Sequence, residues 1–431
     1  MHGRAQPTPF AEVFPNDQGH DLGGVMPPGS RRLSALNRLL LKSWAKGWSP
    51  VPSLDPDHLV ARAARLTGVD DFGDNVPWRM NLAILTRALQ AEAALSPLGR
   101  TIAHGQLVGA LCHRLRAQRL WARHPEIAAQ PITAPIIVLG QMRSGTTRVQ
   151  RLLAQDRRFT FTRFYESWSP IPRGRLLDDR RLQGGVGLLA ARLINPGFSA
   201  IHPTSTASPD EEIGLFSLAL YGATLESQWR VPSFARHCEA LDTRPIYAEF
   251  RKLLQTLSWL RGEDGARPYI LKVPQFTQDL ASLLRVFPDA RLICLDRPFD
   301  ALVASSASLV RNQMAVQSDD VDPHWIGREW AGKIALRQAR TRAVRARSNV
   351  PQIDLSFQAM NSDWRGEMRR VYRFLEMPLE REVEARMTRY LARSRRHKLD
   401  RHRYSLAEFG LTAADLAEAR LPFTQSLIQS S

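Results

Sequence analysis

A short segment in the first third of the chain combines a continuous apolar run with a glycine-containing loop. Residues 136–139 read Ile-Ile-Val-Leu, and Gly140 and Gly145 follow. The apolar run is typical of a strand buried on both faces, while Val149 and Leu152 then recur at helical spacing. Glycines let successive backbone amides converge on one point, where the N-terminus of the next helix adds partial positive charge. The segment therefore predicts a strand, a phosphate-binding loop and a helix.

Other apolar runs extend this unit into a sheet. Residues 269–273, 291–295 and 352–355 have the length and composition of buried strands, and residues 159–165 alternate apolar and polar like a further strand. Helical patterns separate these runs along the chain. Strands that alternate with helices imply a parallel sheet with helices on both faces. We therefore expect an α/β fold, a P-loop-like parallel sheet flanked by helices.

The pattern changes along the chain in a way that suggests three parts. Residues 1–30 contain Pro and Gly without any period, which predicts a loose N-terminal arm. Leucines recur every three to four residues through 31–130, and this part is expected to be a helical N-terminal region. The α/β domain is expected to span 131–425, with a helical insertion at about 170–265 that covers the carboxyl edge of the sheet.

The glycine loop is similar to a nucleotide phosphate loop but lacks its lysine. The pattern GxxxxGK[ST] has a lysine directly after the second glycine, where this chain has Thr146. That lysine reaches the β- and γ-phosphates during phosphoryl transfer. Here the cation stands three residues upstream, at Arg143. The loop therefore favours an anion held by Arg143 and by the backbone amides of residues 144–147.

This loop and a second cluster carry a family resemblance. The run from Arg143 to Thr147 is similar to the 5′-phosphosulfate loop of sulfotransferases that use 3′-phosphoadenosine 5′-phosphosulfate (PAPS). In that family a strand-end arginine and a serine eight residues later hold the 3′-phosphate, and Arg297 and Ser305 stand at this separation. The chain resembles bacterial PAPS-dependent sulfotransferases and, more distantly, tyrosylprotein sulfotransferases. Further similar segments, between about residues 50 and 420, are 67–74, 97–100, 123–127, 208–212, 271–274, 287–291, 402–405 and 409–411.

The resemblance implies a function and a donor site. It implies an enzyme that moves the sulfuryl group of PAPS to a hydroxyl or amine of a small-molecule, lipid or glycan acceptor. PAPS is then the co-substrate, and no metal is expected, because arginine and lysine can neutralise the charge that develops on the leaving phosphate. The residues expected to bind PAPS are Arg143, Ser144, Gly145, Thr146, Thr147, Arg297 and Ser305.

Three side chains are expected to take part in the transfer itself. Arg143 holds the sulfuryl group, and Lys272 resembles the lysine that tyrosylprotein sulfotransferases place on the transferring group. Glu166 is expected to be the base, because it lies 23 residues after Arg143, like the glutamate base of the tyrosylprotein and heparan-type enzymes. Burial beside Tyr165 and Trp168 is expected to raise the pKa of Glu166 toward a useful value.

Several alternatives stay open at this point. His202 is the rival base, since cytosolic sulfotransferases use a histidine and His202 precedes the acidic residues 210–212, which are expected to start a helix. The cations in 393–403 either close over the 3′-phosphate, meet an acidic acceptor, touch anionic lipid or form a solvated helix face. The alternative functions are a P-loop-type nucleotide-dependent kinase and a basic binder of nucleic acid or membrane surfaces.

Charge and cysteine content add limits of their own. The chain has 59 Lys and Arg against 42 Asp and Glu, a formal net charge of +17, which favours anionic partners without choosing among them. Its three cysteines lack metal-binding spacing and indicate buried thiols in a reducing compartment. We see no signal peptide or membrane span. A cytoplasmic protein is expected, without a nucleic-acid partner and with peripheral membrane contact left open.

Overall fold

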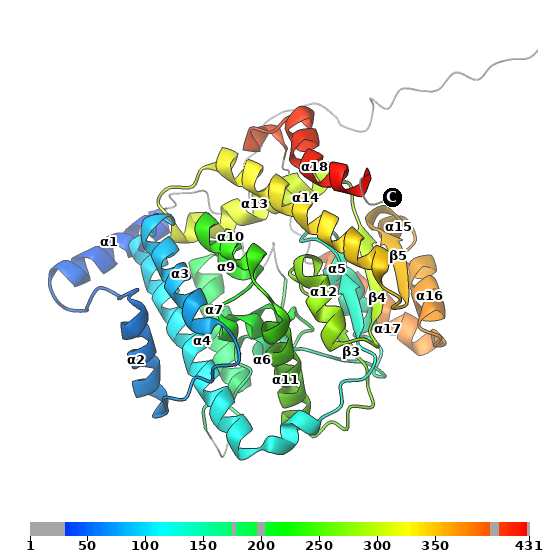
Figure 1. Cartoon of the computed structure of the whole chain (residues 1–431), viewed down its shortest axis with the longest axis horizontal. Helices are drawn as coiled ribbons and strands as arrows, with labels where there is room; N and C mark the ends of the chain where they lie inside the picture. The colour runs from blue at the N-terminus through cyan, green and yellow to red at the C-terminus, as the bar shows by residue number, and fades with distance from the viewer. Residues whose placement is uncertain (1–30, 175–177, 196–202, 397–404, 429–431) are drawn as a thin grey trace, which may run out of the picture.

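The computed structural model describes residues 31–174, 178–195, 203–396 and 405–428, which surround a parallel sheet with helices (Figure 1). Its strands pair in the order β2-β3-β1-β4-β5, and every pairing is parallel. The strands are β1 (Ile136–Leu139), β2 (Thr160–Phe161), β3 (Tyr269–Leu271), β4 (Arg291–Asp296) and β5 (Gln352–Ser356). The α/β fold predicted from the sequence is confirmed.

Helices precede the sheet and fill the interval between β2 and β3, as the fold prediction required. The N-terminal helices are α1 (Arg31–Ala45), α2 (Pro56–Thr67), α3 (Trp78–Ala91), α4 (Pro97–Arg123) and the 3-10 helix η1 (Pro125–Ala129). The helices of the insertion are α6 (Phe164–Trp168), α7 (Arg180–Ile194), η2 (Glu212–Ala219), α9 (Ala223–Gln228), α10 (Pro232–Ala240) and α11 (Arg244–Arg261).

The remaining helices connect the strands or follow the last one. One of them, α5 (Thr146–Leu153), comes directly after the glycine loop. The others are α12 (Phe276–Val286), α13 (Phe299–Gln317), α14 (Pro323–Arg347), α15 (Phe357–Ser362), α16 (Trp364–Phe374), α17 (Arg381–Arg396), η3 (Ala407–Phe409) and α18 (Ala413–Ile428). No helix within the described ranges combines the length and the apolar composition needed to cross a bilayer.

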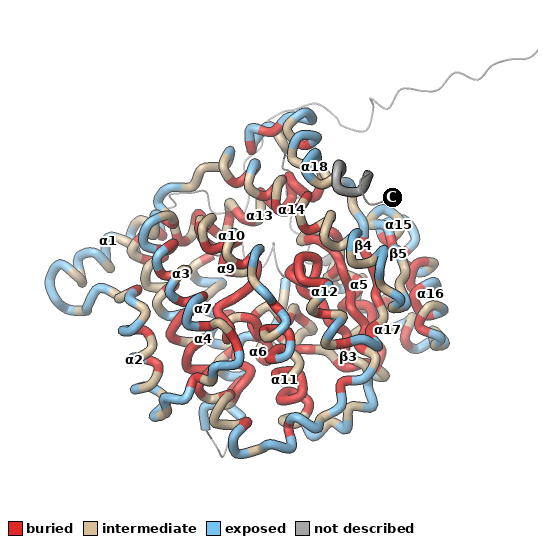
Figure 2. Tube along the Cα trace, viewed as in Figure 1, coloured by how far each residue is buried: buried red, intermediate tan, exposed pale blue. Residues whose placement is uncertain are grey.

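β1 lies in the middle of the sheet and is buried along its whole length. Because alternate side chains of a strand point to opposite faces, β1 contributes to two hydrophobic clusters. Ile137 and Leu139 pack on the face covered by α11 and α12. Ile136 and Val138 pack on the opposite face, together with apolar residues of α5, α16 and α17. Figure 2 shows the sheet and its adjoining helix faces as largely buried.

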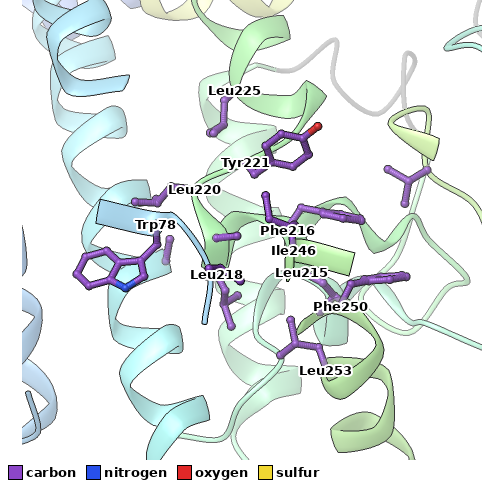
Figure 3. Close-up of a cluster of buried hydrophobic side chains, with 14 of the residues drawn as sticks. Trp78, Leu215, Phe216, Leu218, Leu220, Tyr221, Leu225, Ile246, Phe250 and Leu253 are labelled. Atoms are coloured by element: carbon purple, nitrogen blue, oxygen red, sulfur yellow. The ribbon is translucent and has the colours of Figure 1, made fainter. Parts of the chain in front are cut away.

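The first of these clusters also includes residues of the N-terminal helices. Trp78 of α3 and Phe216 of η2 belong to it with β1, and the ring of Phe216 stacks on Phe250 of α11 with centroids 4.8 Å apart (Figure 3). Helices from both sides of residue 130 thus share one core. The division of the chain into a helical region and an α/β domain at that position stays a prediction.

One expected strand is much shorter than its sequence pattern suggested. Residues 159–165 alternate in polarity, but β2 contains only Thr160 and Phe161, and α6 begins at Phe164. The reason is local: Arg163 and Glu166 form a capping box, in which the Glu166 side chain accepts the backbone N–H of Arg163. The expectation of a strand through Tyr165 is therefore wrong.

Candidate active site

The loop between β1 and α5 makes a tight turn at the carboxyl end of β1. Arg143 and Gly145 have positive φ angles of 69° and 92°. A Cβ atom on Gly140 would lie 2.6 Å from Ser144 Oγ and 2.9 Å from Thr146 Cγ2. The turn therefore depends on glycine at position 145 for its positive φ angle and at position 140 for lack of space. It precedes the N-terminus of α5, which favours a bound anion.

β4 brings the second predicted cluster to this loop. The Nε of Arg143 donates to Ser305 Oγ at 3.0 Å, and Nη1 of Arg297 donates to the main-chain carbonyl of Arg143 at 2.7 Å. Arg297 follows β4 directly, and Ser305 lies on α13. The guanidinium of Arg297 also lies over the ring of Phe357, 4.4 Å from its centroid. Two motifs more than 150 residues apart thus meet in one place.

β3 brings Lys272 to the other side of the loop. Lys272 Nζ donates to Thr147 Oγ1 at 3.0 Å and forms an ion pair with Glu211. Its backbone N–H donates to Glu212 Oε2 at 2.8 Å. Lys272 is buried, because it follows a central strand directly. The loop is therefore contacted by cationic side chains from both neighbouring strands.

The two glutamates beside Lys272 differ in their surroundings. Glu211 retains 16% exposure, whereas Glu212 is fully buried and its Oε1 has no hydrogen-bond partner among the described residues. Burial raises the pKa of Glu212 to about 8, although the backbone amide of Lys272 opposes the shift. This shift favours the neutral carboxyl form of Glu212. The sequence interpretation of residues 210–212 is close to the structure, since η2 begins at Glu212.

Glu166 has a different set of neighbours. It is fully buried in the first turn of α6 and accepts hydrogen bonds from Arg163 Nη1 at 2.9 Å, Tyr165 Oη at 3.1 Å and Arg261 Nε at 2.8 Å. A second hydrogen bond joins it to Nη2 of Arg261. Burial acts to raise its pKa, but Arg261 and Arg163 outweigh it, so the pKa of Glu166 lies below its ordinary value. The expectation of a raised pKa is wrong.

The predicted site residues thus fall into two groups. The loop residues 143–147 lie together with Lys272, Arg297 and Ser305. Glu166 is held by Arg163, Tyr165 and Arg261, which come from outside this loop. His202 and residues 397–404 of the basic run lie outside the residues that the structure describes.

Sequence reasoning missed some partners at the site. The sequence pattern predicts Glu211 only as part of a helix start, and its pairing with Lys272 joins positions 61 residues apart. Phe357 carried no signal at all, because it follows β5 in the sequence like an ordinary apolar residue. Arg261 stands in an amphipathic helix, where arginines are common on solvated faces. The contacts of these residues with the predicted ones depend on the packing of helices and loops far apart in the sequence.

The match to known proteins agrees with this geometry. A model described as the Sulfotransferase family matches residues 135–381, more than half of the chain. The chain belongs to the sulfotransferase family. This matched region contains β1, the glycine loop, Lys272 and the Arg297–Ser305 cluster, and it identifies the protein as a transferase. No curated protein sequence matches the chain.

Two solved structures resemble this sulfotransferase over most of its length. Sulfotransferase STF1 from Mycobacterium tuberculosis H37Rv is 28% identical, with a TM-score of 0.74 over 86% of this chain and 99% of that one. Sulfotransferase STF9 from Mycobacterium avium is 27% identical, with a TM-score of 0.73 over 86% of this chain and 96% of that one. Both likenesses extend beyond the family match, into the N-terminal helices or the C-terminal ones.

The cysteines and the donor set around the loop bear on possible metal binding. The three cysteines are free and buried. Within the described ranges, no group of three or more His, Cys, Asp or Glu side chains is arranged to hold a metal ion. The donor set that contacts the loop consists of arginine, lysine and hydroxyl groups, which suits anions rather than cations.

Proposed function

We propose that this sulfotransferase uses PAPS as its donor and transfers the sulfuryl group to a hydroxyl or amine of a small-molecule, lipid or glycan acceptor. The observation that supports this most is the contact of Arg143 with Ser305 and Arg297. PAPS carries two anionic groups, a 3′-phosphate and a 5′-phosphosulfate. Two groups of cationic and hydroxyl side chains adjoin the loop, Arg297 with Ser305 on one side and Lys272 with Thr147 on the other.

The residues around the loop fit such an anion. Backbone amides of residues 144–147 precede or begin α5, where the helix dipole adds positive potential. A Cβ on Gly145 would lie 2.9 Å from Phe357 Cδ2, so the glycine keeps the loop close to the residue that stacks on Arg297. When bound, PAPS supplies an activated sulfuryl group and leaves as adenosine 3′,5′-bisphosphate (PAP).

The individual roles follow from the contacts. We assign Arg143 and the amides of 144–147 to the 5′-phosphosulfate, and Arg297 with Ser305 to the 3′-phosphate. Lys272, held against Thr147, is assigned to the oxygens that gain negative charge during transfer. Its buried position removes it from bulk water, which strengthens its interaction with those oxygens.

Two carboxylates are candidates for the base that removes the acceptor proton. Glu166 is the residue predicted from the sequence, but two arginines occupy its oxygens, and its lowered pKa makes it a weaker proton acceptor. Glu211 is also ion-paired, with Lys272 through Oε1, but it keeps part of its surface accessible and its partner contacts the loop. We therefore favour Glu211 as the base and assign Glu166 to holding the segment around Arg163 in place.

Calorimetry with PAP and with ATP and Mg²⁺ tests the donor. We expect PAP to bind and Arg143→Ala to weaken it by about tenfold to a hundredfold, since each charge-assisted hydrogen bond contributes about 1.5–3 kcal/mol. Arg157→Ala, at an exposed arginine outside the loop, is the matched control and should bind PAP like the parent. Tighter, Mg²⁺-dependent binding of ATP would instead support the kinase alternative, which the missing lysine at Thr146 already disfavours.

Turnover tests the transfer. Incubation with radiolabelled PAPS and pooled small molecules, lipids and glycans should label acceptors by one sulfate each, as mass detection would show. Lys272→Ala should lower this labelling by orders of magnitude while leaving PAP binding within about tenfold. Labelling by the Lys272→Ala variant at the parent rate would remove Lys272 from its assigned role.

A further inference from the structure

A surface formed by α1 and the loop after it is both cationic and apolar. In Figure 1 this loop extends away from the rest of the molecule before α2 begins. Its apolar side chains are well exposed, with values of 60% for Leu39, 52% for Leu41, 67% for Trp48 and 52% for Val51. We call this region the α1 surface, which consists of Arg32, Arg38, Leu39, Leu41, Lys42, Lys46, Trp48 and Val51.

The cations of the α1 surface follow one side of the helix. Arg38 and Lys42 are four residues apart on α1 and share one side of it. Lys46, in the turn directly after α1, continues this stripe, because its backbone N–H donates to the Lys42 carbonyl at 3.1 Å. Residues 31–54 contain no Asp or Glu. The ion pairs among described residues include none of these cations, while Lys46 Nζ lies over the Trp48 ring, 4.7 Å from its centroid. Like charges four residues apart on a helix repel one another, so an anionic partner would stabilise this stripe.

The opposite side of α1 attaches the helix to the body. Leu33 is buried, and the Asn37 side chain accepts the backbone N–H of Leu98 at the start of α4, at 2.9 Å. Packing therefore explains the inner face of α1 but not the exposure of Leu39 and Leu41 on the helix, nor of Trp48 in the loop after it. Single exposed apolar side chains are ordinary, whereas a tryptophan beside leucines and a stripe of cations points to a particular kind of partner.

We propose that the α1 surface binds an anionic lipid bilayer. Basic amphipathic segments lie in the interface plane, with cations toward anionic headgroups and apolar side chains below them. Tryptophan favours that interface because its ring is apolar and its indole N–H is polar. A nucleic acid would satisfy the cations but would leave Leu39 and Val51 in water.

A second copy of the chain fits this surface less well. Self-pairing through α1 would bring two unneutralised cationic stripes together, on chains that each carry a formal net charge of +17. The outer side of α7 is a rival membrane surface, with Leu182, Val186, Leu189 and Leu193 at 58–72% exposure. It has fewer cations, Arg181 and Arg192 on its exposed positions, and it therefore provides a useful control.

Sedimentation of the full chain with vesicles tests the proposal. We expect it to bind vesicles of equal parts phosphatidylcholine and phosphatidylglycerol, to bind phosphatidylcholine alone much less, and to release at high salt. Lys42→Gln with Lys46→Gln should weaken binding on the order of 30-fold, since each cation near an anionic surface contributes about fivefold. Arg342→Gln with Arg347→Gln, exposed cations on α14, removes the same charge and should leave binding within about twofold.

Apolar variants separate this surface from its rivals. Trp48→Ser should weaken vesicle binding about tenfold with an unchanged denaturation midpoint, because the side chain is mostly exposed. Leu182→Ser with Leu189→Ser on α7 should change little. Equal weakening by both cation pairs, loss of binding only in the α7 variant, or a dimer that Trp48→Ser converts to monomer would each overturn the proposal.

Discussion

Replacing Glu166 by glutamine is expected to act on stability more than on chemistry. The carboxylate is fully buried, and its two oxygens accept hydrogen bonds from Arg163, Tyr165 and Arg261. Glutamine retains one acceptor oxygen but turns an NH₂ group toward a guanidinium. Breaking a buried ion pair by changing one partner costs about 3–5 kcal/mol, because the other charge stays buried without compensation. We expect Glu166→Gln to lose about 3 kcal/mol of unfolding free energy.

Glu211→Gln is the matched comparison. Glu211 keeps 16% exposure, and its partner Lys272 retains the hydrogen bond to Thr147. We expect this variant to lose about 2 kcal/mol, because Lys272 stays buried but keeps its hydrogen bond to Thr147. It should lower turnover by about 10²–10⁴-fold, the usual contribution of a general base. Its affinity for PAP should stay within a few-fold of the parent value.

Urea denaturation at neutral pH, with turnover under conditions where both variants are folded, measures the two effects. The folded pKa of Glu166 is lowered, so its contribution is complete above the unfolded value of about 4.3 and is lost as pH falls through the folded pKa. The difference in unfolding free energy between the parent and Glu166→Gln should therefore become smaller as the pH is lowered. A Glu166→Gln protein as stable as the parent but without turnover would refute this reasoning and restore Glu166 as the base.

Three further predictions concern the same site. Glu212 has a folded pKa of about 8 against about 4.3 unfolded, so the stability that it contributes should fall as pH rises between these values. In denaturation series the parent should therefore lose more stability over this range than Glu212→Gln does. Gly140→Ala places a methyl group 2.6 Å from Ser144 Oγ. Because such overpacking costs about 1–3 kcal/mol, it should weaken PAP binding about tenfold by calorimetry, and unchanged affinity would show that the loop tolerates the methyl group. Ser305→Ala should weaken PAP binding several-fold, while Ser308→Ala on the same helix, a partly exposed serine, should not, and equal effects would contradict the assignment.

The parts of the fold that the sequence predicted well share one property. Residues 136–139 and 291–295 are short, mainly apolar runs. Such a run is typical of a strand in a parallel sheet, because helices cover both faces of that sheet and bury every side chain of the strand. Residues 159–165 lacked that property. Their alternation fits a strand, but the capping box of Arg163 and Glu166 starts a helix instead. A local hydrogen-bond pattern thus outweighed a polarity pattern.

The site was predictable only as far as its residues are consecutive or follow strands. The glycine loop is local, and Lys272 and Arg297 each end a strand, so parallel pairing brings them to one sheet edge. The environment of Glu166 depends on Arg261, 95 residues away on another helix. Burial was foreseeable there, but the sign of the pKa shift was not, because that sign depends on a partner which only the tertiary structure supplies.

The central place of β1 has a consequence for biosynthesis. Ile136 pairs with Ile270 on one side and with Arg291 on the other, so both neighbours are made more than 130 residues after β1 itself. A nascent chain that ends at α11 contains the glycine loop and β1, but neither β3 nor β4 has been synthesised. The apolar side chains of β1 therefore lack the strands that flank them in the folded protein. Non-local pairing of this kind is slow and leaves the strand open to wrong contacts. Early translation products should therefore depend on chaperones, and donor affinity should emerge only when synthesis has passed β4.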